Sequence, residues 1–172
     1  RDTRAAACVM DWLYAWAEGQ ALLGEINVQG SYARQWSLST LASAYLQVRD
    51  LSLYDQQKKE AIEQWLSAVA TEIMKTYTDL SGSLRKQNNH LYWGAWAVTI
   101  TGVAVDNRTF YEWGVNKAKY ALHVQVQKDG TLPYEIIRGK KALQYHIFAL
   151  APLVMICEVA VRNGDDLYEI NN

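Results

Sequence analysis

The sequence predicts an all-α fold built from antiparallel helical hairpins. Apolar residues recur at steps of three and four along most of the 172 residues. No stretch alternates cleanly enough between apolar and polar residues to predict a strand. The connections are mostly shorter than about fifteen residues, and short connections make consecutive helices run in opposite directions. About six such helices suit a bundle or an α/α toroid. In a closed toroid of six hairpins, this chain would supply about half of the ring.

The composition excludes several classes of protein. Half of the residues are hydrophobic and 20% are charged, so the chain can bury a sizeable core and is not intrinsically disordered. The formal net charge of −1 argues against general nucleic-acid binding through a basic surface. The sequence has no uncharged apolar run of about 18 residues, so we expect no membrane span.

The first half of the chain predicts three helices, over residues 3–23, 31–49 and 55–77. In the first helix Cys8, Trp12 and Trp16 mark one apolar stripe, and Gly24 is a natural stop. The second and third helices also carry apolar residues at helical spacing. These are Leu38, Leu41, Tyr45 and Val48 in the second helix, and Ile62, Leu66, Val69 and Ile73 in the third. A run of charged residues on the opposite side of the third helix indicates a solvated face.

Three more helices are expected in the second half. One opens near Asn88, and the next starts at Thr109, which forms a capping-box pattern with Glu112. The apolar stripe of that second helix consists of Phe110, Trp113, Tyr120 and Val124. The last helix occupies residues 142–162, with Pro152 kinking it.

Familiar catalytic and metal motifs are absent from the sequence. It has no G-x-S-x-G, HExxH, P-loop or G-x-G-x-x-G pattern, which argues against serine hydrolases, zincins, P-loop NTPases and dinucleotide enzymes. The three histidines are not closely paired, so we expect no metal site. Cys8 and Cys157 are compatible with buried thiols, a disulfide, or bridges to other sequence.

Two clusters carry the most chemical information. Residues 88–96, Asn-Asn-His-Leu-Tyr-Trp-Gly-Ala-Trp, crowd two amides, an imidazole and three aromatic rings together. Residues 129–146 combine a turn, a basic segment and Tyr145. Taken alone, the first cluster suits a capped, buried helix and the second suits a turn followed by a helix start.

Together these clusters resemble the poly(mannuronate) lyase family of alginate lyases. The resemblance continues in order through residues 8–13, 29–36, 112–115 and 149–158. It implies an α/α toroid in which residues 1–172 form a single domain. A lid region before this segment and further helices after it would belong to a longer enzyme. Gly94 departs from the family pattern, in which alanine is common at this position.

The resemblance also implies a reaction and its residues. Cleavage of a uronate polymer by β-elimination requires neutralising the carboxylate, removing the C5 proton and protonating the leaving C4 oxygen. Asn89 and His90 would act at the carboxylate, Asn89 as an amide donor, and His90 is an alternative base. Tyr145 would be the acid and, for mannuronate, also the base, with Arg138 folding back beside it. If side chains neutralise the carboxylate, the reaction needs no metal or organic cofactor.

The substrate would be gripped by Gln29, Tyr32 and Trp36, which recur on one helical face. A local basic patch would attract the polyanion. Its candidate members are Arg34, Arg85, Lys86, Arg138, Lys140 and Lys141.

The expected partners are therefore alginate or polymannuronate oligosaccharides, without nucleic acid or membrane. We expect a monomer that is periplasmic or secreted, because alginate is an exported polymer. Two alternatives stay open: a non-catalytic domain that binds acidic polysaccharides, and a related lyase acting on another uronate polymer. A hydrolase would need two placed carboxylates, and the available pair, Asp129 and Glu135, falls at positions expected to be structural.

Overall fold

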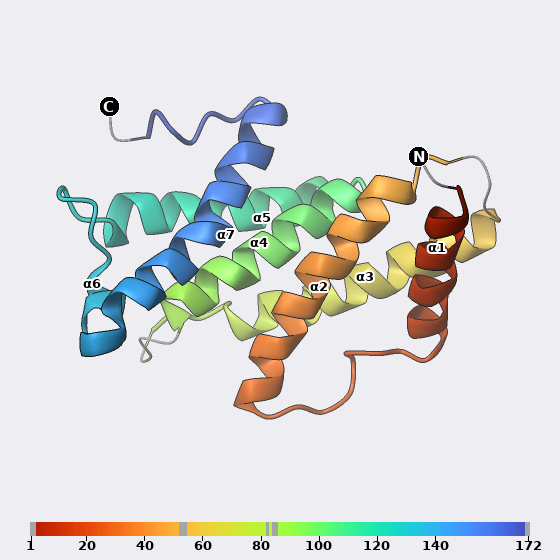
Figure 1. Cartoon of the computed structure of the whole chain (residues 1–172), viewed down its shortest axis with the longest axis horizontal. Helices are drawn as coiled ribbons and strands as arrows, with labels where there is room; N and C mark the ends of the chain where they lie inside the picture. The colour runs from red at the N-terminus through yellow and green to blue at the C-terminus, as the bar shows by residue number, and fades with distance from the viewer. Residues whose placement is uncertain (1–2, 52–54, 82, 84–85, 171–172) are drawn as a thin grey trace.

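Helices account for all regular secondary structure that the computed structural model describes, which covers residues 3–51, 55–81, 83 and 86–170 (Figure 1). The long helices are α1 (Thr3–Glu18), α2 (Val28–Val48), α3 (Gln56–Thr76), α4 (Asn89–Ala104), α5 (Arg108–Tyr120) and α7 (Ala142–Arg162). Shorter elements are the π-helical turn η2 (Ala121–Gln125), α6 (Pro133–Ile136) and the 3₁₀ turn η3 (Gly139–Lys141). The predicted all-α class is confirmed.

Side-chain caps set where most long helices begin. The capping residues are Asn27, Asp55, Asn88 and Asn107, each accepting a hydrogen bond from a backbone N–H in the first turn. Asn88 opens α4 as predicted. The prediction that the fifth helix starts at Thr109 was slightly wrong, because Asn107 caps it instead.

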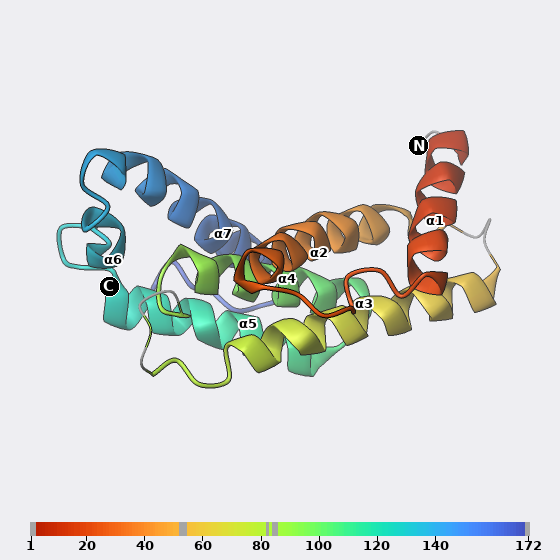
Figure 2. The same cartoon turned by 90° about the horizontal axis from the view of Figure 1, so that it is seen from below.

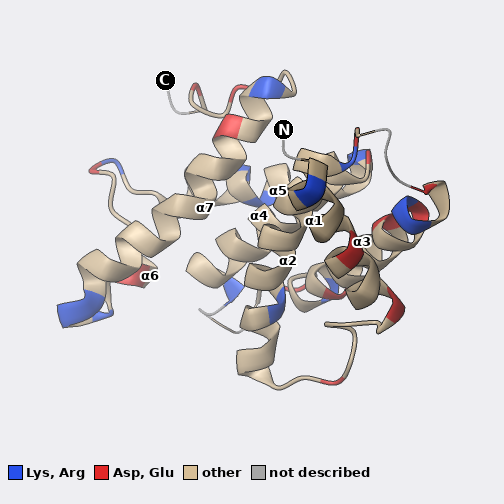
Figure 3. Cartoon of the chain, turned by 45° about the vertical axis from the view of Figure 1, so that its right-hand side comes forward, with Lys and Arg blue, Asp and Glu red and all other residues tan. Residues whose placement is uncertain are grey.

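Helix direction alternates along the chain, as expected for consecutive hairpins. In Figure 1, α2, α4 and α7 run one way, and α3 and α5 run the other. Figure 2 shows α2 and α7 on one side of the molecule and α3 and α5 on the other. The central helix α4 packs against all four. It carries no Lys, Arg, Asp or Glu, as Figure 3 shows, because nearly every one of its residues is buried.

The predicted apolar stripe of α1 was wrong. Cys8 is exposed, and Trp12 is 65% exposed. The buried face consists of Ala6, Met10, Leu13 and Ala17, and it faces α2 and α3. The helix also ends at Glu18, before the predicted Gly24 stop.

The predicted stripe of α5 was also wrong. Phe110 and Trp113 are only partly buried, and Val124 lies beyond α5 and is 58% exposed. The buried face consists of Tyr111, Gly114, Val115 and Ala118. An added Cβ on Gly114 would collide with Thr99 and with the carbonyl of Ala95, so the small residue allows α4 and α5 to approach closely.

The bounds predicted for the last helix are confirmed, with Pro152 inside α7. Its outer side is apolar, with Leu143, Ile147 and Leu150 all more than half exposed. Within the described ranges, Gly139–Arg162 is the one helical stretch long and apolar enough to cross a membrane by length and composition, and 33% of its apolar window is buried. The expectation that the chain has no membrane partner stays a prediction.

Both cysteines are free thiols. Cys8 is exposed and Cys157 is buried, and burial raises the pKa of the Cys157 thiol. Cys8 and Cys157 therefore do not pair with each other.

Candidate active site

A cavity of about 770 Å³ opens where the first turns of α2 and α4 meet the start of α7. Its lining consists of Val28, Gln29, Tyr32, Trp36, Asn89, His90, Arg138, Gln144, Tyr145, Ile147 and Phe148. All seven site residues predicted from the sequence are among them. The structure thus brings these residues into one concavity, and the chemical roles assigned to them stay predictions.

His90 is held between a ring and a backbone network. The Tyr32 ring stacks on the imidazole, with ring centroids 3.6 Å apart and planes 8° from parallel. The His90 carbonyl accepts hydrogen bonds from Gln35 Nε2 at 3.0 Å and from the Tyr77 hydroxyl at 2.8 Å. Burial raises the pKa of the Tyr77 phenol far above its usual value, so Tyr77 remains a donor.

Asn89 has a different partner, Glu135 of α6. The backbone N–H of Asn89 donates to Glu135 Oε1 at 2.8 Å. The side-chain nitrogen Nδ2 lies 3.0 and 3.1 Å from the two carboxylate oxygens. Asn89 and Glu135 are both fully buried. Glu135, which was expected to be structural, therefore contacts a predicted site residue directly.

Arg138 and Tyr145 lie together although seven residues separate them. Gly139 adopts the left-handed conformation, with φ at +57°, which turns the chain between Arg138 and α7. The Arg138 guanidinium consequently lies over the Tyr145 ring, 4.2 Å from its centroid. This is the fold-back that the sequence predicted, and it leaves a cation beside the phenol.

An aromatic wall completes one side of the cavity. Phe148 meets Trp36 edge-on, with centroids 6.0 Å apart, and lies 5.2 Å from Trp93. Sequence reasoning missed Phe148 and Gln144 as cavity residues. For Phe148 the spacing from Tyr145 was the available signal, since it follows Tyr145 by about one helical turn. Gln144 directly precedes Tyr145 and carried no such signal.

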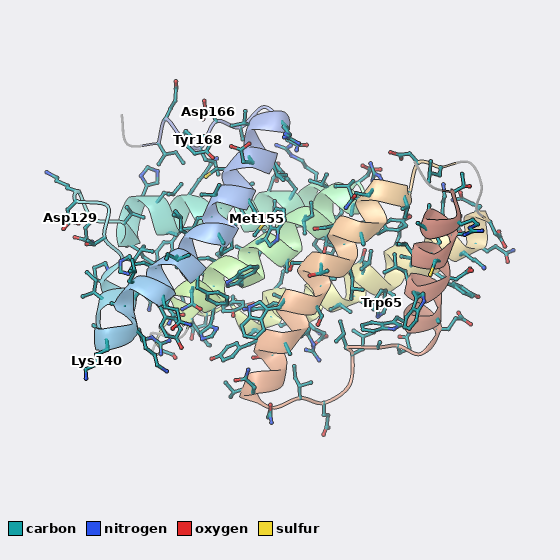
Figure 4. All side chains as sticks on the ribbon, viewed as in Figure 1. Trp65, Asp129, Lys140, Met155, Asp166 and Tyr168 are labelled. Atoms are coloured by element: carbon teal, nitrogen blue, oxygen red, sulfur yellow. The ribbon has the colours of Figure 1, made fainter. Side chains whose placement is uncertain are left out.

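The predicted basic patch is smaller than expected. Arg34 is buried and donates to the Gly24 carbonyl at 2.9 Å, so it does not belong to the patch. Arg85 lies outside the described residues. Arg138, Lys140 and Lys141 are exposed around the start of α7, and Figure 4 shows Lys140 pointing away from the helices. Lys86 is half-buried and donates to the Asp79 carbonyl at 2.9 Å. Among the described members of the patch, the exposed charge is therefore concentrated on this one segment.

The other polar candidates have structural roles. His146 accepts a hydrogen bond from the Leu132 N–H through Nε2, so its Nδ1 carries the proton that is shared with the Ala142 carbonyl. Among the described residues, no three His, Cys, Asp or Glu side chains are grouped to hold a metal ion.

The arrangement suits acid–base chemistry on an anionic sugar. A phenol and an imidazole, both suited to proton transfer, share one cavity with an exposed guanidinium. The aromatic wall offers flat surfaces for sugar rings.

Comparison with known proteins identifies the family. The family model described as alginate lyase matches residues 1–172. An alginate lyase of Cobetia marina is 39% identical over 170 residues, which cover 96% of this chain and 45% of that protein. The crystal structure of alginate lyase A1-III from Sphingomonas species A1 matches with a TM-score of 0.86 at 32% identity, over 94% of this chain and 45% of that one. A variant of alginate lyase A1-III complexed with a tetrasaccharide matches with the same TM-score at 31% identity, again over 94% of this chain and 45% of that one.

These matches bear on the fold and on the extent of the chain. The predicted fold class, helical hairpins that form part of an α/α toroid, is confirmed. The chain spans about half the length of the relatives it matches. Because the family model matches residues 1–172, this chain belongs to the alginate lyase family.

Proposed function

We propose that the protein containing this chain is a polysaccharide lyase that cleaves alginate by β-elimination and favours mannuronate-rich stretches. The observation that carries the proposal is that Asn89, His90, Arg138 and Tyr145 line the same cavity in a member of this family. A tetrasaccharide complex of alginate lyase A1-III supports an oligosaccharide as the ligand.

The reaction needs a base and an acid at adjacent atoms of the sugar. The base removes the C5 proton, the C–H electrons form the C4–C5 double bond, and the C4–O bond to the leaving sugar breaks. The leaving oxygen takes a proton from the acid. The products are a new non-reducing end with an unsaturated uronate and a new reducing end.

Tyr145 is proposed to serve both ends of this reaction for mannuronate. In β-mannuronate the C5 hydrogen and the C4 oxygen lie on the same side of the ring, so one group can take the first proton and donate the second. The Arg138 guanidinium lies 4.2 Å from the centroid of the Tyr145 ring, so it can stabilise negative charge that develops beside it during the reaction. His90, which lines the same cavity from α4, is proposed to stabilise the charge that develops on the carboxylate.

The experiment compares polymannuronate with polyguluronate as substrates of the full-length protein. A lyase generates ultraviolet absorbance from the unsaturated product, and we expect a faster rise with polymannuronate. New reducing ends without absorbance would indicate a hydrolase, and binding without either signal would indicate a non-catalytic domain. Either result would overturn the proposal.

We further propose that the full-length protein is a monomer located in the periplasm or secreted, where an exported polymer is accessible. Cell fractionation and size-exclusion chromatography test this. Recovery only in the cytoplasm, or only as an oligomer, would contradict it.

A further inference from the structure

Glu135 is a buried anion with an unusual set of partners. Its side chain is completely buried, and its carboxylate accepts all of its observed side-chain hydrogen bonds from one residue, Asn89. No ion pair to Glu135 is formed within the described part of the chain. Burying a carboxylate is costly unless it is well hydrogen-bonded. Placing a negative charge beneath a cavity for an anionic sugar also opposes substrate binding, so stability and attraction do not explain its place.

The contact determines which end of the Asn89 amide points where. An ionised carboxylate only accepts hydrogen bonds, so the end of the amide that faces Glu135 must be the donor Nδ2. The other end, Oδ1, is buried and has no hydrogen-bond partner among the described residues. Glu135 therefore holds the Nδ2 end of the amide and fixes the orientation of Asn89 in the cavity wall.

Glu135 also connects two parts of the site. Its backbone carbonyl accepts a hydrogen bond from the Arg138 N–H at 3.1 Å. The residue thus contacts the first turn of α4 through its side chain and the segment that carries Arg138 through its backbone. A shift of Glu135 would move a residue on each of two cavity walls.

We propose that Glu135 is a positioning residue of the lyase site, which holds the Asn89 amide by its nitrogen and so fixes the orientation of Asn89 in the cavity wall. The inference rests on the proposed function, because it assigns Glu135 to that same reaction.

The test is a double-mutant cycle in the full-length protein, with rates of unsaturated product formation from polymannuronate. Glu135→Gln keeps the shape but introduces a donor, so the Asn89 amide loses its fixed orientation. We expect kcat to fall about 10- to 100-fold, as small misplacements in an active site do, while KM changes by less than about threefold. In the Asn89→Ala background the same substitution should change kcat by less than about twofold, because Glu135 then has no amide to orient.

Two controls separate positioning from structural support. Asp129→Asn removes a carboxylate from the outer loop between α5 and α6, where its side chain only caps Thr131, and should leave kcat unchanged (Figure 4). Thermal unfolding of every variant monitors folding. If Glu135→Gln does not fold, Glu135→Asp carries the same cycle, since it keeps the charge and shortens the reach.

Three outcomes would decide against the inference. A Glu135→Gln enzyme with more than about half of the wild-type kcat would show that the orientation is irrelevant. An equal loss of kcat in the presence and absence of the Asn89 amide would show that Glu135 does not act through it. A wild-type protein that forms no unsaturated product would instead overturn the proposed function, and this inference with it.

Discussion

At the scale of single residues, Tyr145 carries the sharpest prediction. Tyr145→Phe deletes only the oxygen that we propose transfers protons, and it keeps the ring under the Arg138 guanidinium. We expect kcat on polymannuronate to fall by about 10² to 10⁴, with KM close to the wild-type value. Initial rates of absorbance change measure both constants. Retention of more than about a tenth of the wild-type kcat would remove Tyr145 from the catalytic role.

Trp36→Ala is the contrasting variant on the same cavity. Trp36 packs against Tyr32 and Phe148 in the cavity wall, so under the proposed function we expect its indole to contribute to binding of substrate and transition state alike. We expect KM to rise and kcat to change little. A loss confined to kcat would argue that Trp36 acts on the chemistry instead.

Gly94 provides a second residue-scale prediction. A Cβ at this position would lie 2.6 Å from Tyr77 Cε2 and 3.2 Å from Gln35 Oε1, the two residues that hold the His90 carbonyl. Overpacking of about 1–3 kcal/mol opposes a gain in helix propensity of up to about 1 kcal/mol. We expect Gly94→Ala to lower Tm and also kcat, because the His90 backbone shifts.

The matched control for Gly94→Ala is Gly24→Ala. No heavy atom lies within 4 Å of a Cβ built on Gly24. Thermal unfolding should show little change for the control. A Tm for Gly94→Ala at or above that of the wild type would mean that Tyr77 yields without strain.

The sequence was informative about residues only where they belong to ordered motifs. Asn89, His90, Arg138 and Tyr145 could be proposed because their neighbours along the chain match a family pattern. The burial of Glu135 could not be proposed, since its partner Asn89 is 46 residues away and an acidic residue in a turn is ordinarily exposed. Contacts of this kind depend on how α4 and α6 are packed, which single-sequence periodicity does not specify.

At the scale of helices, Arg49 joins the end of α2 to the end of α4. Its Nη1 donates to the carbonyls of Val103 and Ala104, at 3.0 and 2.8 Å, which are among the last of α4. Arg49→Met keeps the apolar stem but removes both charge-assisted hydrogen bonds. We expect a loss of about 1–3 kcal/mol in the free energy of unfolding, measured as a lower Tm.

A surface ion pair serves as the control for this helix cap. Lys58 of α3 contacts Asp11 of α1 at 3.0 Å, and both side chains are well exposed. Solvent screens such pairs, so Lys58→Met should leave Tm nearly unchanged. Equal losses for the two variants would contradict the capping role of Arg49.

Helix bounds could be predicted better than helix faces. Caps are local signals, and an asparagine cap located the start of α4. The bounds predicted for α7 were also correct. The buried faces of α1 and α5 depend on their neighbours. Close approach to α4 selects Gly114 and Ala118 over the larger Trp113 on α5, so ranking residues by hydrophobicity chose the wrong side.

At the scale of the whole molecule, buried tyrosines set the response to alkali. Burial raises the pKa of Tyr45, Tyr77 and Tyr92 well above that of a free phenol. The hydrogen bond to Glu63 further raises the pKa of Tyr45, and the negative charge of Glu135 further raises the pKa of Tyr92. In the unfolded chain these phenols ionise near pH 10. Above that pH the folded state binds more protons than the unfolded state, so stability falls as the pH rises.

The measurement is Tm as a function of pH, together with ultraviolet titration of tyrosinate. These tyrosines should leave Tm flat up to about pH 9 and lower it increasingly between about pH 10 and 12. Tyr77→Phe should make the decline shallower, because one of the shifted groups is gone. A Tm that rises through this range, or tyrosines that all titrate near pH 10 before unfolding, would contradict the prediction.

The shared direction of α2, α4 and α7 also determines the electrostatics of the cavity. Their first turns all border it, and each helix carries roughly half a positive elementary charge at that end, spread over backbone N–H groups. This potential acts over about one turn of helix, so it reaches a ligand only inside the cavity. A protein with a formal net charge of −1 can therefore repel polyanions at long range and still favour them at one place. The attraction of this cavity for anionic groups is then partly a property of helix direction, which no side-chain substitution removes.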